Sequence, residues 1–406
     1  MIAHRLRPAL ASLLFVAIAG TASVSQAQGT GVRPEVGKPL QAAQALIKAR
    51  KGKEALAEVA KAEAVPNRTP NENNLIQQMK GSAALAAGDN ETVIRTYEPM
   101  VESGRASGRE GLQMVQAVAI AYYQRKEYAK AAQWTQRYFK DGGTDGAMRN
   151  VQLQSYYLAN DCNNVNRMLG SATEADSTRK PTEEELQILA NCYLRGKDTG
   201  GYVNAIEKLV VFYPKKEYWT DLLSRVQKKP GFSDRLGVNV YRLRFATGNA
   251  GTAPDYMEMA QLALQAGVPA EAKVIMDKGY AAGVLGKGDQ AERQKRLRDM
   301  VQKAYDESLK ARAADEAAAL AAKDGNDLVK VGLNYVYEGN AAKGVPMIEQ
   351  GIKKGGLRRV EDARLRLGEA QLFAGQKQKG VQTLRDVKGT DGTADIARLW
   401  VLNARA

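Results

Sequence analysis

Two stretches near the C-terminus decide the fold: residues 328–339 read LVKVGLNYVYEG, and residues 364–375 read RLRLGEAQLFAG. In each stretch a glycine lies in the middle of a helix-compatible segment, and a second glycine follows seven residues later. A small residue within a helix lets a neighbouring helix approach closely, and a later glycine can adopt the left-handed conformation that ends the helix. Each stretch therefore predicts a helical hairpin.

The same spacing of small residues occurs at four places in the chain. The four pairs are Gly81/Gly88, Ala260/Gly267, Gly332/Gly339 and Gly368/Gly375. The last two copies are 36 residues apart and share Lys-Gly-Val at Lys343 and Lys379. Such a period is typical of proteins in which helical hairpins stack on one another.

The composition agrees with a helical fold. Only 6% of the 406 residues are aromatic and 12 are proline, while Ala, Gln, Lys, Arg and Glu are plentiful. These residues favour helices and disfavour a β-sandwich. We therefore predict an all-α protein, an α-solenoid of antiparallel helix hairpins.

A family resemblance appears between residues 111 and 139. Val115, Val118-Ala119, Tyr122, Tyr128 and Ala131 follow a characteristic order of bulky, large-small, tyrosine, large and alanine positions, with Lys126 where a turn glycine is expected. This pattern resembles the tetratricopeptide repeat family. The resemblance extends over about two thirds of the mature chain. It implies a superhelix of hairpins and defines architecture better than function.

The N-terminus predicts export. Arg5 and Arg7 precede an apolar run from Ala9 to Ala19, and small residues at Ser25 and Ala27 suit a signal peptidase. The run is too short to cross a bilayer, so residues 1–27 are predicted to be a cleaved signal peptide. No later stretch is apolar enough to be a second span. We expect a periplasmic mature protein.

Removal of the signal peptide also removes His4, the only histidine. The mature chain then has no imidazole for a catalytic triad, for general base catalysis or for a histidine-rich zinc site. We predict a protein that is not an enzyme and needs neither a metal nor a cofactor.

We predict two helical regions, residues 28–230 and residues 231–406. Both contain tetratricopeptide-like hairpins, and Lys228-Lys-Pro-Gly231 marks the boundary because Pro-Gly ends helices. The sequence leaves open whether the solenoid is continuous there. It also leaves open whether Asp289 to Ala322 is a repeat or one long helix. Residues 394–404, with Trp400, are predicted to cap the final repeat.

Cys162 and Cys192 are the only cysteines. In the repeat register, Cys162 begins the second helix of one hairpin and Cys192 lies near the end of the next hairpin's first helix, so both fall at the same end of adjacent helices. An exported protein with an even pair favours a disulfide over two free thiols.

Groove positions of the tetratricopeptide family predict the partner-binding surface. They correspond here to Gln116, Tyr123, Gln124, Val329, Leu333, Tyr337, Glu369 and Phe373. Tyrosine, glutamine and aliphatic side chains suit an extended or helical peptide. The alternative is that these residues pack against neighbouring helices.

The predicted function is that of a scaffold or adaptor that binds a protein or peptide partner in the cell envelope. The formal charge is +14, and +12 once Arg5 and Arg7 are removed. An exported basic protein meets anionic envelope polymers rather than nucleic acid. Binding of such a polymer is the alternative, through the basic stretch Lys208 to Arg244 or through Lys353-Lys354 and Arg358-Arg359.

Overall fold

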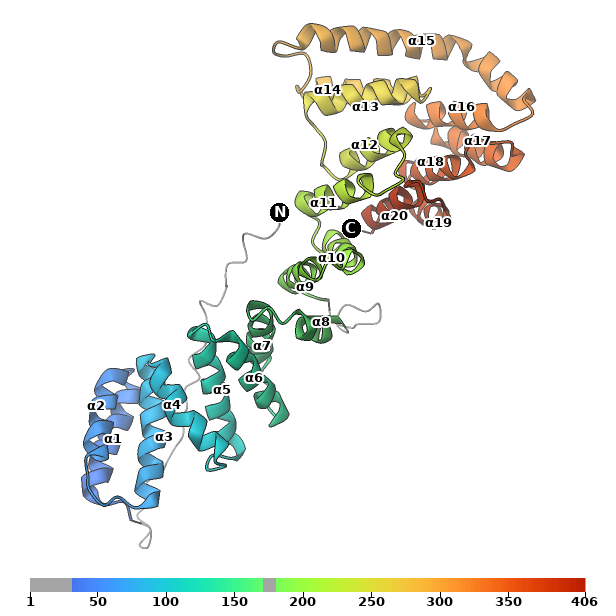
Figure 1. Ribbon diagram of the computed structural model, residues 1–406. Coiled ribbons are helices and arrows are strands. Elements are labelled where there is room, and N and C mark those ends of the chain that lie inside the picture. The colour runs from blue at the N-terminus through green and yellow to red at the C-terminus, as the bar shows by residue number, and fades with distance from the viewer. Residues whose placement is uncertain (1–30, 171–179, 406) are drawn as a thin grey trace. The chain divides into compact units, whose positions relative to one another are not determined.

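The computed structural model describes residues 31–170 and 180–405, and within these residues every regular element is a helix (Figure 1). The predicted all-α class is confirmed. The predicted signal peptide lies outside the described residues. Contacts divide the chain into two compact units, Met1–Pro181 with Asn191–Asp198 and Thr182–Ala190 with Thr199–Ala406. The boundary that the sequence suggested near Gly231 lies inside the second unit.

The first unit is a series of antiparallel helix hairpins. Its helices are α1 (Pro34–Lys48), α2 (Gly52–Glu63), α3 (Pro70–Ala87), α4 (Asn90–Glu102), α5 (Gly108–Gln124), α6 (Tyr128–Lys140), α7 (Gly146–Leu158) and α8 (Cys162–Gly170). Each packs against its neighbours in the chain. Helix α9 (Glu183–Arg195) contributes its last residues to this unit and its first residues to the second.

The second unit continues with helices of similar length, apart from one. Its further elements are α10 (Thr199–Phe212), α11 (Lys216–Gln227), the 3-10 helix η2 (Asp234–Leu236), α12 (Gly237–Ala246), α13 (Ala253–Gln265), α14 (Pro269–Ala281), α15 (Ala291–Ala321), α16 (Asn326–Tyr337), α17 (Ala341–Lys354), α18 (Val360–Phe373), α19 (Lys377–Arg385) and α20 (Thr393–Asn403). Helix α15 is a single helix of 31 residues, so the segment from Asp289 to Ala322 is not a helical hairpin.

Side-chain caps fix where several helices begin. Thr69 and Glu72 form a capping box at the start of α3, and Thr252 and Asp255 form another at the start of α13. Each box satisfies backbone N–H groups that the first helical turn leaves free. Glu72 also accepts hydrogen bonds from Arg33, and these bonds, together with that from the Thr69 backbone, lower the pKa of Glu72 to about 2.

The paired small residues have the two roles that the sequence predicts. A Cβ atom on Gly332 would lie 2.7 Å from the carbonyl oxygen of Gly344 on α17, and one on Gly368 would lie 2.5 Å from Leu384 on α19. The later glycines, Gly339 and Gly375, have φ values of +87° and +74° at the ends of α16 and α18. The first glycine permits close packing, and the second ends the helix.

Replacing Gly332 with alanine tests this packing. We expect Gly332→Ala to lower the free energy of unfolding by about 1–3 kcal/mol, because the added methyl group forces α16 away from α17. Urea unfolding followed by circular dichroism measures the change. Gly237→Ala is the control, since that Cβ would meet only Leu262 at 3.8 Å. Equal stability of the two variants would contradict the close approach.

The C-terminal helix closes the second unit on itself. Helix α20 packs on α18 and α19 and also on α10 and α12. The Ser233 backbone N–H donates to the Asp391 carbonyl oxygen at 2.9 Å, and Lys229 lies 2.5 Å from Asp395. Residues 228–231, where the sequence left a break open, are therefore held against the last helix. Helix α20 covers the final hairpin and also joins it to the first helices of the same unit.

The predicted disulfide is present. Cys162 at the start of α8 and Cys192 in the last part of α9 are joined, with their Cα atoms 5.2 Å apart. Both residues belong to the first unit. The bridge closes a loop with a sequence separation of 30 residues.

Thiol titration of the unfolded, non-reduced protein checks the bridge. We expect no reactive thiol, and two reactive thiols would contradict it. Replacing both cysteines with serine should lower the stability of the first unit by about 3 kcal/mol, because the unfolded chain regains the loop entropy that the bridge removes.

Candidate functional site

The predicted groove residues of the first unit connect helices α5 and α7. Gln116 Nε2 donates to Asp145 Oδ2 at 3.2 Å, just before α7. The Tyr123 hydroxyl donates to Gln154 Oε1 at 2.5 Å, and its ring meets Tyr128 edge-on with 5.5 Å between centroids. Gln116 and Tyr123 are half-buried, whereas Gln124 is exposed. This surface is polar, and its side chains are held in place by their neighbours.

In the second unit the structure brings three aromatic side chains together. Phe373 on α18 lies 5.8 Å from Tyr337 on α16 and 6.0 Å from Trp400 on α20, measured between ring centroids. We call these three residues the aromatic row. Trp400 is buried, Tyr337 is half-buried and Phe373 is 55% exposed. The exposed ring of Phe373 therefore lies between the half-buried Tyr337 and the buried Trp400.

Three other predicted groove residues are buried. Val329 and Leu333 belong to a hydrophobic core cluster that includes Ile348 and Leu367. Glu369 is 1% exposed and forms ion-paired contacts inside the unit. Their side chains face neighbouring helices, which is the packing alternative. Of the second unit's predicted residues, Phe373 is exposed and Tyr337 is half-buried.

A network of buried charges lies beneath the aromatic row. The Arg242 guanidinium on α12 donates from Nε and Nη2 to the two carboxylate oxygens of Glu271 on α14, at 2.7 and 2.6 Å. Its Nη1 donates to Glu369 Oε2 at 3.0 Å. Glu369 Oε1 also accepts from Asn239 at 3.0 Å and from the Trp400 indole at 2.9 Å. We call Asn239, Arg242, Glu271 and Glu369 the charge cluster.

The charge cluster is shielded from water, which makes its hydrogen bonds obligatory. Arg242, Glu271 and Glu369 are each at most 3% exposed. A buried charge is tolerated only where it is paired and hydrogen-bonded. Burial raises the pKa of Glu369 and that of Tyr337, whose ring centroid is 6.0 Å from the Arg242 guanidinium. The Arg242 guanidinium and the carboxylates of Glu271 and Glu369 join α12, α14 and α18, and the Trp400 indole joins α20 to Glu369.

Helix α18 presents one stripe to these partners. Asp362, Arg366, Glu369 and Phe373 follow at intervals of four, three and four residues, so they share one helix face. Asp362 accepts from Arg235 Nε at 3.0 Å and from its Nη2 at 2.8 Å. Arg366 is half-buried, and burial together with the nearby Arg242 charge lowers its pKa.

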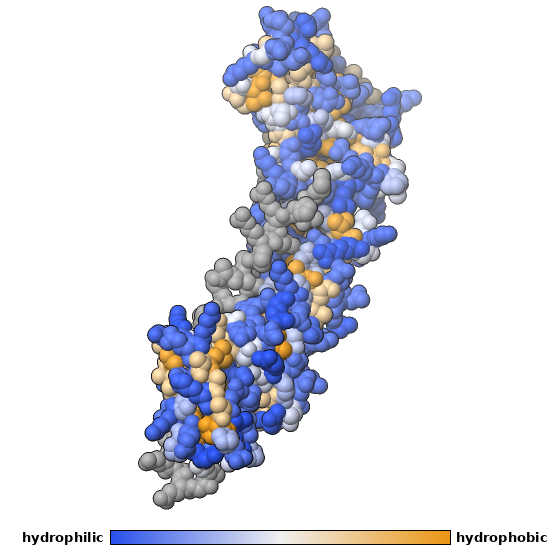
Figure 2. All heavy atoms as spheres, turned by 60° about the vertical axis from the view of Figure 1, so that its left-hand side comes forward, coloured by the Kyte–Doolittle hydropathy of each residue, from blue (hydrophilic) through white to orange (hydrophobic). Residues whose placement is uncertain are grey.

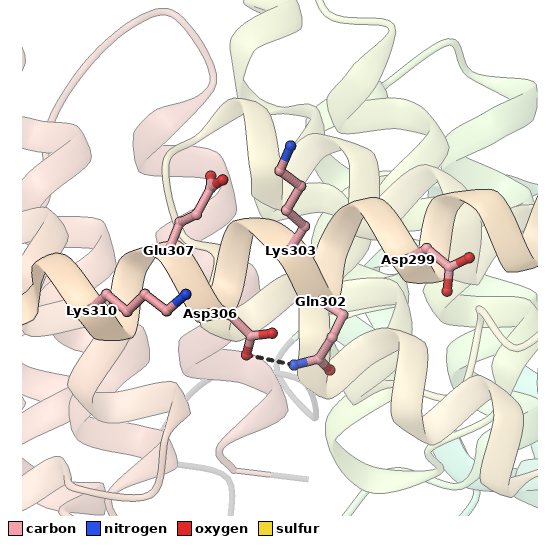
Figure 3. A pocket seen from close by; sticks show the side chains of 6 residues that line it. All are labelled: Asp299, Gln302, Lys303, Asp306, Glu307 and Lys310. Atoms are coloured by element: carbon pink, nitrogen blue, oxygen red, sulfur yellow. Dashed lines mark hydrogen bonds between the residues drawn. The ribbon is translucent and has the colours of Figure 1, made fainter.

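Helix α15 carries a shallow hollow that is not a comparable site. Its lining comes from one face of one helix, and Figure 3 shows the side chains that project from it: Asp299, Gln302, Lys303, Asp306, Glu307 and Lys310. Gln302 and Asp306 bond to each other at 2.8 Å. Side chains of a single exposed helix cannot enclose a ligand.

The described part of the chain shows neither a metal site nor a membrane span. In the described part of the chain, no group of His, Cys, Asp and Glu is arranged to hold a metal ion, and no helix is long and apolar enough to cross a membrane.

Most cations of the stretch from Lys208 to Arg244 pair with carboxylates of this chain. The paired residues are Lys215, Arg225, Lys229, Arg235, Arg242 and Arg244.

Sequence reasoning did not identify the charge cluster. Arg242 and Glu369 are 127 residues apart in the chain, and no local motif connects them. Arg242 lies within the basic stretch that the sequence offers for polymer binding, and Trp400 lies within the predicted capping segment. The only sequence signal for the charge cluster is a polar residue at a core-facing position of α12, α14 and α18.

No protein-family model matches the sequence, and no curated protein is significantly similar to it. Among solved structures, the crystal structure of the yeast Tom70 matches at 11% identity, covering 91% of this chain and 95% of that one, with a TM-score of 0.26. Because the two chains superpose so poorly, the fold rests on the helices described above.

Removing the Glu369 carboxylate tests the charge cluster. We expect Glu369→Ala to destabilise the second unit by about 3–5 kcal/mol, because Arg242, Asn239 and Trp400 lose their shared acceptor in the core. Denaturant unfolding followed by tryptophan fluorescence measures this. The control Glu307→Ala removes an exposed carboxylate of α15 and should change stability by less than about 0.5 kcal/mol. Equal effects of both substitutions would show that the cluster does not stabilise the fold.

Proposed function

We propose that this protein is a non-enzymatic scaffold of the cell envelope that binds a segment of a partner protein at the aromatic row. The observation that carries the proposal is Phe373, a large apolar side chain that is 55% exposed beside Tyr337 and Trp400. Exposed aromatic anchors with rigid surroundings are typical of binding hot spots.

The surroundings of Phe373 support this assignment. On the face shown in Figure 2, hydrophobic residues reach the surface as small patches among hydrophilic ones. Phe373 differs from a scattered apolar residue because it extends from an aromatic row that the charge cluster holds in place. A side chain that is fixed before binding loses little conformational entropy when a partner covers it.

The envelope location is part of the proposal. It rests on the predicted signal peptide and on the disulfide between Cys162 and Cys192. Disulfides form and persist in oxidising compartments such as the periplasm. The surface around Tyr123 in the first unit is a second candidate for partner contact, with polar rather than aromatic chemistry.

The proposed role is non-enzymatic because the buried carboxylates of the charge cluster already have structural partners. Glu271 and Glu369 accept hydrogen bonds from Arg242, Asn239 and Trp400. A general acid or base needs a group that can reach a substrate proton. These carboxylates instead hold four helices together.

Binding of an anionic polymer has less support. Six cations of the basic stretch are already paired within the chain, as described above. Lys354 donates to the Ala319 and Leu320 carbonyl oxygens at the end of α15. Lys353, Arg358 and Arg359 are exposed, which is ordinary for surface cations.

A photo-crosslinking residue tests the proposed function. The photoreactive analogue p-benzoylphenylalanine replaces Phe373 in one variant and Met300 in another, and each full-length variant is expressed in the source cells. Met300 is a matched control because it is 60% exposed and lies on α15, outside the aromatic row. We expect a discrete adduct with one envelope protein from position 373 and none from position 300.

Mass spectrometry of the adduct identifies the partner and its attached peptide. The same adducts at the same yield from both positions would indicate chance encounters and would contradict the proposal. So would the absence of any adduct from position 373.

A further inference from the structure

Arg366 is a guanidinium with no acceptor in the described part of the chain. It lies on α18, one turn before Glu369 and two turns before Phe373, and it is half-buried. No hydrogen bond or ion pair joins it to another described residue. A guanidinium has five N–H donors in a planar fork, and those of Arg366 bond to no described residue.

The carboxylates near Arg366 are already occupied. Asp362, one turn earlier, accepts two hydrogen bonds from Arg235. Both oxygens of Glu369 accept from Arg242, Asn239 and Trp400, and both oxygens of Glu271 accept from Arg242. Arg366 still lies in the field of Glu369 and Asp362, so it contributes to the charge balance of this face. Its hydrogen-bonding capacity nevertheless remains unused.

The half-buried Arg366 and the exposed Phe373 therefore lie on one helix face, on either side of the buried Glu369. Seven residues separate them, which corresponds to about 10 Å along a helix axis. Glu369, which lies between them on the stripe, is fixed by the charge cluster, so this distance is set by a rigid helix. An extended peptide advances about 3.3 Å per residue, so about three residues span the two positions.

Resting on the proposed function, we infer that the partner is an extended peptide segment in which a carboxylate side chain, Asp or Glu, lies about three residues from an aromatic or aliphatic side chain. The carboxylate binds the Arg366 guanidinium, and the apolar side chain covers Phe373 beside Tyr337. A guanidinium fork pairs with a carboxylate through two parallel hydrogen bonds, which a neutral amide cannot reproduce.

A random peptide library displayed on phage and panned against the mature protein, residues 28–406, tests this inference. We expect the enriched peptides to share an Asp or Glu about three residues from an apolar residue. A synthetic peptide of this kind should bind at least about tenfold more weakly when its acidic residue is changed to the amide. Arg366→Gln should lose the same factor, and the amide peptide should bind the wild type and Arg366→Gln equally.

Two further variants separate the possible outcomes. Arg366→Lys keeps the charge but loses the planar fork, so it should bind with intermediate affinity and fold even if Arg366→Gln does not. Phe373→Ala should weaken all enriched peptides. If the peptides depend on Phe373 but bind equally well after either change at Arg366, or without their carboxylate, the inference is overturned while the proposed function stands. If no peptide is enriched, or if Phe373→Ala has no effect, both fail.

Discussion

The second unit depends on one buried guanidinium. Arg242 on α12 donates to Glu271 on α14 and to Glu369 on α18, and Glu369 in turn accepts from Trp400 on α20. Four helices from distant parts of the sequence thereby meet at one hydrogen-bonded network. Because each buried charge needs its partner, a shift of α12, α14 or α18 would leave a charge unpaired in the core, and a shift of α20 would break the bond from Trp400 to Glu369. The network therefore fixes the positions of these helices relative to one another.

This constraint connects the fold to the proposed binding surface. The small residues of the repeat let each hairpin close tightly, but they do not specify how the first and last helices of the unit meet. The charge cluster and the contacts of α20 with α10 and α12 provide that closure. The same stripe of α18 that carries Glu369 also carries Arg366 and Phe373. The fixed register of α18 therefore places a cation and an aromatic ring at a set distance on the surface.

The sequence predicted the parts of this structure that depend on local geometry. The glycines at Gly332 and Gly339 pack and turn as expected, Lys126 adopts a φ of +63° where a turn glycine was missing, and Cys162 pairs with Cys192. It did not predict contacts made between distant helices. Helical periodicity identifies a core-facing position but not the residue that meets it 127 positions away, as for Arg242 and Glu369. The groove positions Val329 and Leu333 are core residues here for the same reason.

Hydrogen exchange of the variant Arg242→Met, followed by mass spectrometry, tests the central role of Arg242 most directly. The substitution removes the cation and leaves Glu271 and Glu369 without their shared donor. The account predicts that α12, α18 and α20 lose protection together, while helices α1 to α6 of the first unit keep theirs. If α18 and α20 kept the protection of the wild type, Arg242 would not hold this face together, and the account would be contradicted.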